Sequence, residues 1–484
     1  MNGKDMLNLM SELDERVVAD AEAASIKKRG KWKIIFGAVA AALVVGILGY
    51  TLYPYVTGKN GKGKDKNLSS GYLMASPQYP EMPENPNLSN EYDAKKSDEY
   101  RHALETLRNQ PEGYQDGYDA YLRDMLSVIL SDTGKENKAF SPLSLYMALS
   151  MTAEITEGET RQQILDVLHQ PDMAMLRDHA KSVWLANYMD DGIAKLVLAN
   201  SLWLNTDRTY EQAVLETLAG NYFASCYCGD PTSEKYSQAF RDWINEQTDG
   251  LLEGMLSDLK LEPDLVIALA STVNYSGKWV NAFEPDMTRT GTFHAPSGDV
   301  NCEYLCTDTV YENYYGDHFE CVALPIIGNG SVRFILPEEG MTPEELLQDE
   351  ELIRFLNANG RDWAKTAEYA GIHLEVPKFD ISSDLKLNDY LNAMGITDLF
   401  DAGNADFSPL IGKNEAGVYV SSIKQSTRVM IDEEGCKAVS ATIELAGDAI
   451  SEEDYELILN RPFVFEIVSE SGLPIFVGIV NDPA

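Results

Sequence analysis

Basic residues are scarce in this chain of 484 residues. It contains 39 Lys and Arg against 77 Asp and Glu, and its formal net charge is −38. Binding to nucleic-acid phosphates requires a basic stripe or patch, so this charge balance excludes a nucleic-acid partner. The acidity predicts a soluble surface; the alternative is that it attracts a basic partner.

Cysteine is also rare. Six cysteines in 484 residues are too few for a disulfide scaffold. The two close pairs, Cys226-x-Cys228 and Cys302-x3-Cys306, fit neither a zinc-ribbon nor a redox spacing. We therefore expect buried free thiols and no metal site. Two cysteine pairs that meet in space around a metal are the alternative.

Sequence signatures of catalysis are missing. The six histidines are scattered, and the chain has no His-Glu-x-x-His helix, Gly-x-Ser-x-Gly elbow or nucleotide-binding glycine motif. The alternative is an enzyme whose Ser/His/Asp triad is assembled from residues that lie far apart in the sequence. We predict that the protein is not an enzyme and needs no cofactor.

One long apolar run lies near the start of the chain. Residues 34–52 include no charged side chain, and as a helix these 19 residues would span roughly 28 Å, close to the hydrocarbon thickness of a bilayer. Tyr50 and Tyr53 lie where an interfacial aromatic belt would be. The Lys and Arg cluster over residues 27–33 favours an N-terminus inside the cell.

These features predict a cytoplasmic tail over residues 1–33, a single transmembrane signal-anchor helix over 34–53 and an extracellular linker over 54–109. The linker is rich in Pro and Asn to about residue 87, so we expect that part to be extended and mobile. The folded domain, residues 110–484, would then lie outside the cell, attached to the cell membrane. The alternative is a cleaved signal and a secreted protein.

Apolar spacing in the folded part changes along the chain. It is helical over residues 118–130, 143–151 and 160–168, and Ser141 is in position to cap the second of these helices. Strand-like runs follow over residues 196–204, 266–275, 372–379, 417–431, 463–467 and 475–480. Helices that cluster early and strands that cluster late predict an α+β fold.

Seven blocks in this part resemble the serpin family of serine protease inhibitors, and they occur in the family's order. They are NKAFSPLSLYMALSMTAEITEGETRQQILDVL from residue 137, NSLWL from 200, GKWVNAF with TR and FH from 277, VPKF from 376, MGITDLF with ADFS from 394, DEEG from 432 and NRPF from 460. The resemblance implies one domain with three β-sheets, about nine helices and an exposed reactive-centre loop between Glu433 and Asn460. Departures from the family pattern suggest a diverged, bacterial-type member.

The resemblance also implies a mechanism. A serine protease cuts the loop and becomes acylated, and the loop's upstream arm then inserts into the large sheet and traps the acyl-enzyme. The protein would be a suicide substrate and a monomer. The alternative is a non-inhibitory serpin that acts as a cell-surface binding or structural protein.

The resemblance assigns roles to particular residues. The scissile bond is expected at Ala449–Ile450, with a shift to Ile450–Ser451 as the alternative, and a small residue there suits an elastase-like or subtilisin-like protease. The hinge residues are Glu433, Glu434, Gly435, Cys436, Ala438, Ser440, Ala441 and Thr442. The shutter and breach residues, which would control opening of the sheet, are Ser141, Ser144, Ser271, Trp279 and Gln425.

The loop's composition is compatible with insertion. Proline, which cannot donate to a strand ladder, does not occur between Glu433 and Asn460. Period-two alternation places Glu444 on the same face as Ala438 and Thr442, the face that the resemblance turns into the core. Burial of that carboxylate would be costly unless it is paired or protonated. The acidic run over residues 452–454 either steers basic proteases or is a solvated loop.

Overall fold

The computed structural model describes residues 71–88, 93–256, 259–263, 265–328, 330–357, 363, 366–412, 417–421, 423–436 and 455–484. The predicted cytoplasmic tail and the predicted membrane span over 34–53 lie outside these ranges, and so does the reactive loop over 437–454. Within the described ranges, no helix combines the length and the apolar character that crossing a bilayer requires.

The last part of the predicted linker is folded. Strand β1 (Leu73–Ala75) pairs with the edge strand β5 (Ala224–Gly229), and helix α3 (Ala94–Arg108) is capped by the Asp93 carboxylate. Tyr79 packs on Trp184 with ring centroids 5.0 Å apart. The extended, mobile linker predicted to about residue 87 is therefore wrong from residue 71 onward. An open sheet edge and an aromatic cluster give this segment hydrogen bonds and buried area that its own sequence does not reveal.

Eleven α-helices occur in the described residues. They are α3, α4 (Tyr118–Ile129), α5 (Pro142–Ile155), α6 (Gly158–Val167), α7 (Met173–Asn187), α8 (Gln212–Asn221), α9 (Glu234–Gln247), α10 (Pro343–Leu346), α11 (Glu350–Asn357), α12 (Asn388–Ala393) and α13 (Ser408–Ile411). Helices α10 and α13 are single turns of four residues, and the other nine agree with the predicted number.

The strands form three hydrogen-bonded sheets, as expected. The first has the order β1-β5-β4-β6-β14, with β3 beside β4. The second has the order β15-β11-β8-β9-β10-β16-β17-β2, with β7 beside β8, and the third pairs β12 with β13. In chain order the remaining bounds are β2 (Lys138–Phe140), β3 (Met189–Asp190), β4 (Lys195–Asn205), β6 (Ile267–Lys278), β7 (Arg289–Ala295), β8 (Gly298–Tyr315), β9 (Phe319–Pro325), β10 (Ser331–Pro337), β11 (Thr366–Pro377), β12 (Phe379–Lys386), β13 (Lys424–Ile431), β14 (Gly435–Cys436), β15 (Tyr455–Ile458), β16 (Phe463–Val468) and β17 (Pro474–Val480).

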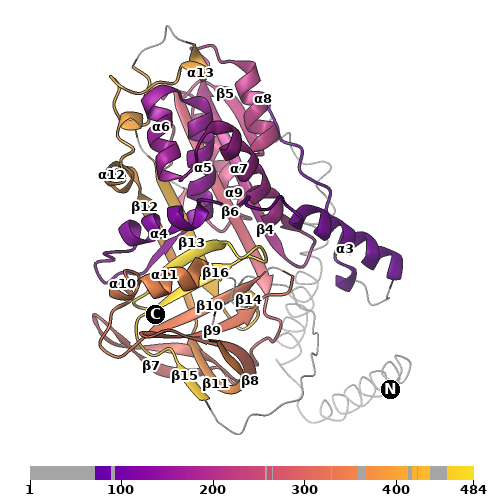
Figure 1. Cartoon of the computed structure of the whole chain (residues 1–484), viewed down its shortest axis with the longest axis vertical. Helices are drawn as coiled ribbons and strands as arrows, with labels where there is room; N and C mark the ends of the chain where they lie inside the picture. The colour runs from indigo at the N-terminus through magenta and orange to yellow at the C-terminus, as the bar shows by residue number, and fades with distance from the viewer. Residues whose placement is uncertain are drawn as a thin grey trace, which may run out of the picture. The chain divides into compact units, whose positions relative to one another are not determined.

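Helix α5 is the central support of the fold. All of its fourteen residues except Ala148 are buried, as expected for a helix that is apolar on every side. Its N-terminus is capped by Ser141, as predicted, and Pro142 occupies the first turn, where a missing N–H is tolerated. Helix α5 contacts β6 on one side and β17 on another, and in Figure 1 it lies over the long strands of the first sheet.

Strand β13 is shorter than the predicted run over residues 417–431. Residues 417–421 and 423 are irregular, because Gly417 has a φ of +79° and Val420 donates its N–H to Leu399 instead of to a strand. Val418 and Val420 are nevertheless buried, so their apolar character reflects packing in the core and not a ladder.

Candidate functional site

A groove separates β6 from β13. Strand β6 pairs with β4 and, at its end, with β14, whereas β13 pairs with β12 alone among the described strands. Three cavities lie along the gap: about 30 Å³ near Tyr275 and Met430, about 30 Å³ near Ser271 and Gln425, and about 110 Å³ near Leu269. Beyond β14, none of the described strands pairs with this edge of β6, and residues 268–273 of β6 are only half-buried.

The predicted shutter residues meet halfway along this groove. The Gln425 side chain of β13 accepts a hydrogen bond from the Ser141 N–H (2.8 Å) and donates one to the Ser141 carbonyl (2.9 Å). The Ser141 hydroxyl donates to the Ile475 carbonyl of β17 (2.8 Å). Gln425 therefore attaches β13 to the start of α5, and the amide makes both bonds at once because it carries a donor and an acceptor.

The opposite wall of the groove is attached to the same helix. The Ser144 hydroxyl in the first turn of α5 donates to the Ser271 carbonyl of β6 (3.0 Å), and the two hydroxyl oxygens lie 3.3 Å apart. The N-terminus of α5 thus bridges both walls through side-chain hydrogen bonds. Each such bond contributes about 1 kcal/mol, so the two walls are attached to α5 by a few weak links that an entering strand can replace.

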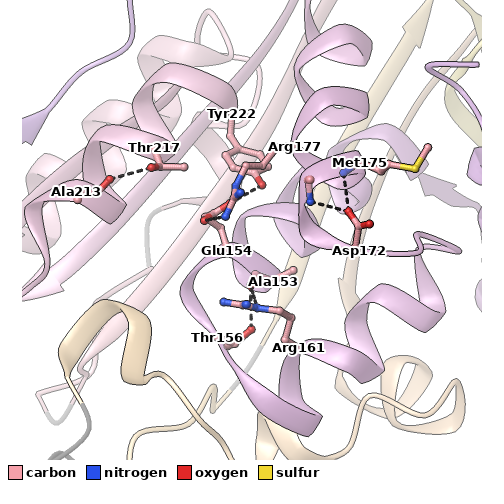
Figure 2. Close-up of polar contacts among 11 residues, drawn as sticks. Ala153, Glu154, Thr156, Arg161, Asp172, Met175, Arg177, Ala213, Thr217 and Tyr222 are labelled. Carbon is pink, nitrogen blue, oxygen red and sulfur yellow. Dashed lines mark hydrogen bonds and ion pairs between the residues drawn. The ribbon is translucent and has the colours of Figure 1, made fainter. Parts of the chain in front are cut away.

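An ion pair between the buried Glu154 and the half-exposed Arg177 holds the other end of α5. The Arg177 guanidinium of α7 donates two hydrogen bonds to the Glu154 carboxylate (2.6 and 2.8 Å), and the Tyr222 hydroxyl donates a third (3.0 Å), as Figure 2 shows. The hydrogen bonds that Arg177 donates to the Glu154 carboxylate raise the pKa of Arg177. A bidentate pair of this kind fixes the helices geometrically, so α5 is a rigid base for the groove.

Trp279 lies at the mouth of the groove, where β13 ends. Its indole N–H donates to the Asp432 carbonyl (2.9 Å), its backbone N–H donates to the Glu434 carbonyl (3.3 Å), and its ring packs edge-on against Phe283. The ring is 2% exposed. Trp279 therefore holds the chain that leaves β13.

Glu433 anchors the start of the hinge. Its carboxylate accepts hydrogen bonds from the Lys378 ammonium (3.1 Å) and from the Thr288 hydroxyl (3.0 Å). Burial alone would raise the pKa of Glu433, but these two donors together with a backbone hydrogen bond lower it. Lys378 lies in the VPKF block, and the sequence did not identify it or Thr288 as hinge contacts, because neither is near Glu433 in the chain.

Gly435 enters the groove first. It pairs with Lys278 of β6, and Cys436 pairs with Gly277, so β14 is a two-residue strand that already occupies the mouth of the gap. Gly435 has a φ of +145°, and a Cβ atom there would lie 2.4 Å from the Gly277 carbonyl oxygen. Only glycine allows this approach and this backbone conformation.

The other predicted residues of the loop lie outside the described ranges. These are the hinge residues Ala438, Ser440, Ala441 and Thr442 and the scissile-bond residues Ala449, Ile450 and Ser451.

Five cysteines of the described chain are free thiols, four of them buried. No cluster of three or more His, Cys, Asp or Glu that could hold a metal occurs in the described ranges.

Comparisons with known proteins identify the family. The serpin (serine protease inhibitor) family model matches residues 120–483. A serpin-like protein of Methanosarcina acetivorans is 25% identical over 75% of this chain and 85% of its own length, and mouse alpha-1-antitrypsin 1-5 is 28% identical over 73% and 85%. The native thermophilic serpin tengpin superposes with a TM-score of 0.63 at 23% identity, over 83% of this chain and 97% of its own. Because the family model covers about three quarters of the sequence, this chain belongs to the serpin family.

Proposed function

We propose that this protein inhibits serine proteases as a suicide substrate and is not itself an enzyme. The observation that carries the proposal is the groove between β6 and β13, with β14 paired to β6 at its mouth. The chain segment that would continue β14 along the groove follows it directly in the sequence.

The reaction begins as ordinary proteolysis. The protease serine attacks the Ala449 carbonyl, the bond to Ile450 breaks, and the new Ile450 amine leaves while Ala449 stays bound to the protease as an ester. Water would normally hydrolyse this ester. In this protein, the severed arm from Gly435 to Ala449 is free to continue the β14 ladder down the groove.

Insertion carries the protease away from its starting position. Fifteen residues at about 3.4 Å each span roughly 50 Å, the length of a large domain. Every inserted residue can form ladder hydrogen bonds with β6 and β13, and the half-exposed residues of β6 become covered. The free energy gained is available to distort the tethered protease before hydrolysis.

The small residues at the scissile bond favour elastase-like or subtilisin-like proteases, whose primary pockets are narrow or apolar. Lys and Arg, which trypsin-like proteases require, do not occur from Thr442 to Asn460.

We further propose that the protein acts as a monomer and that residues 34–53 anchor it in the cell membrane, with the serpin domain outside. Secretion after cleavage of that segment is the alternative.

The test is incubation with elastase and with subtilisin, followed by a denaturing gel. A band at the summed mass of protease and inhibitor supports the trap, whereas clean cleavage without that band refutes it. Ala438→Arg should convert the inhibitor into a substrate, because the register turns this position toward the core. Ala441→Arg is the matched control: it adds the same side chain on the opposite face of the strand, and inhibition should survive.

A non-inhibitory binding function is the second candidate, and Glu444 is the feature that favours it. An acidic residue in the inserting arm opposes full insertion. Among the relatives, the corticosteroid-binding globulin of rabbit is 26% identical over 78% of this chain and 98% of its own length. If cleavage by both proteases leaves no covalent complex at any pH, this second function becomes the better description.

A further inference from the structure

A small apolar cavity lies at one end of the groove between β6 and β13. Its volume is about 110 Å³, and apolar side chains dominate its walls: Leu145, Ala148 and Leu149 of α5, Leu269 of β6, Leu387 and Val420. Ala148, which borders this space, is the one residue of α5 that is not buried. The walls belong to the intact chain, so the cavity exists whether or not the protein traps proteases.

The polar side chains of the inner wall are already bonded within the protein. The Thr152 hydroxyl donates to the Ala148 carbonyl (2.8 Å), and the Ser144 hydroxyl donates to the Ser271 carbonyl (3.0 Å). The Gln425 amide makes its two hydrogen bonds to the start of α5. A water molecule needs two to four polar partners, and this wall offers few. The inner part of the cavity therefore favours an apolar occupant.

The outer rim of the same cavity is cationic. Lys424 of β13 lines the cavity and is exposed. Gln425 points toward α5, so Lys424, its neighbour in the strand, points to the opposite side of the sheet. Lys386 of β12 is directly opposite Lys424 in the β12–β13 register and is also exposed. Two ammonium groups therefore lie side by side where the cavity reaches the surface.

These two lysines lack an acidic partner in the described part of the chain. The lysines in ion pairs there are Lys95, Lys195, Lys260 and Lys378. Asp384, two residues before Lys386 in β12, accepts a hydrogen bond from the Ser426 hydroxyl (2.8 Å). Like charges directly opposite each other destabilise a sheet, and an anion between them removes that cost. In a chain with 77 Asp and Glu against 39 Lys and Arg, such a pair of cations is a specific feature.

The volume sets the length of the apolar part of an occupant. An apolar protein cavity of roughly 150 Å³ binds benzene, which has six carbon atoms. On that scale, the cavity of about 110 Å³ takes roughly four to five carbon atoms. The occupant that matches both the apolar walls and the cationic rim is a short hydrocarbon chain that ends in one carboxylate.

We propose that this cavity binds a short aliphatic carboxylate of about six carbon atoms. The hydrocarbon tail lies between α5 and β6, in contact with Leu145, Ala148 and Leu269. The carboxylate lies at the rim and pairs with Lys424 and Lys386. This binding function is separate from protease inhibition and is carried by the intact protein.

The experiment titrates the full chain at pH 7 and constant ionic strength with linear carboxylates from acetate to octanoate. Binding is followed by the NMR shifts of carbon-13-labelled leucine methyl groups and by calorimetry. Each buried methylene should strengthen binding about fourfold, so hexanoate should bind about 15-fold more tightly than butanoate. Heptanoate and octanoate should add less than about twofold each, because the cavity is then full.

Substitution of Ala148 tests where the tail lies. Ala148→Leu fills the cavity with three further carbon atoms and should weaken hexanoate binding by at least about tenfold. Ala148→Val adds two carbon atoms, fits with less strain, and should move the end of the rise from hexanoate to about butanoate. Ala213→Leu, at an exposed position of α8, is the matched control and should bind as wild type does. Thermal melting without ligand shows that each variant is folded.

Substitution of the two lysines tests where the carboxylate lies. The double variant Lys386→Gln, Lys424→Gln should weaken hexanoate binding about fivefold and leave the binding of hexan-1-ol unchanged. Lys96→Gln, an exposed lysine of α3, is the matched control for the loss of a positive charge.

Three results overturn the proposal. The first is the absence of saturable hexanoate binding up to 50 mM. The second is an affinity that keeps rising by the same factor beyond hexanoate, or that both Ala148 variants leave unchanged, because the tail then lies elsewhere. The third is equal binding of hexanoate and hexylammonium, or no effect of the double lysine substitution, because the rim then does not select a carboxylate. Loss of protease inhibition with this binding intact counts against the proposed function alone.

Discussion

The link between Gln425 and Ser141 offers the sharpest test of how the groove is held together. The two residues are 8% and 2% exposed, and the Gln425 amide bonds both the N–H and the carbonyl of Ser141. Gln425→Ala leaves these two backbone groups buried without their partner. Each unsatisfied group costs about 1–2 kcal/mol, so the substitution should lower the free energy of unfolding of the intact protein by about 2–4 kcal/mol.

A loss of that size corresponds to a fall of about 3–5 °C in melting temperature for a domain of this length. Gln163→Ala is the matched control. Gln163 also bonds two backbone N–H groups, those of Thr397 and Asp398, but at a partly exposed site that water can reach. Thermal melting followed by circular dichroism measures both variants. If Gln425→Ala melts within 1 °C of Gln163→Ala, the bridge does not hold the groove and the reasoning fails.

Three further substitutions test the hinge and the buried charges. Gly435→Ala should abolish the β14 pairing, because a Cβ atom cannot fit at this position. The number of inhibitor molecules consumed per protease molecule inhibited should then rise several-fold. An unchanged stoichiometry in a titration with subtilisin contradicts this. Glu433→Lys places two cations together at the hinge and should lower the melting temperature at pH 7. Because the pKa of Glu433 is lowered in the fold, the difference in melting temperature from wild type should shrink as the pH falls below about 4. A difference that stays constant with pH counts against a stabilising ion pair between Glu433 and Lys378. Burial raises the pKa of Glu466, so wild type should lose stability as the pH rises from about 4.5 to about 7, and Glu466→Gln should remove this loss. The variant should nevertheless be less stable than wild type at pH 7, because Arg333 loses its charged partner. Urea titrations at several pH values measure both effects.

Local features of the sequence were sufficient for much of the fold. The spacing of apolar residues predicted α4, α5 and α6, and Ser141 followed by Pro142 predicted where α5 begins, because caps and helical periodicity are properties of a few neighbouring residues. The strands β4, β16 and β17 were predicted for the same reason. The residues that build the shutter and breach were named in advance only through the resemblance to serpins.

Other features depend on partners that are distant in the sequence. Val418 and Val420 look like part of a strand, but they fill the core from an irregular segment. The segment from residue 71 onward looks like a linker, but it pairs with a sheet edge more than 140 residues away. Lys378 and Thr288 carry no local sign that they bind Glu433.

By itself the sequence determined the family, the α+β class and the position of a proline-free arm with an acid at position 444. The tertiary structure decided that a groove lies between β6 and β13, that Gln425 and Ser141, 284 positions apart, attach β13 to α5, and that apolar side chains dominate the cavity near Leu269. The physical reason is that composition and periodicity act over a few residues, whereas a vacancy between two strands exists only once the elements around it have packed.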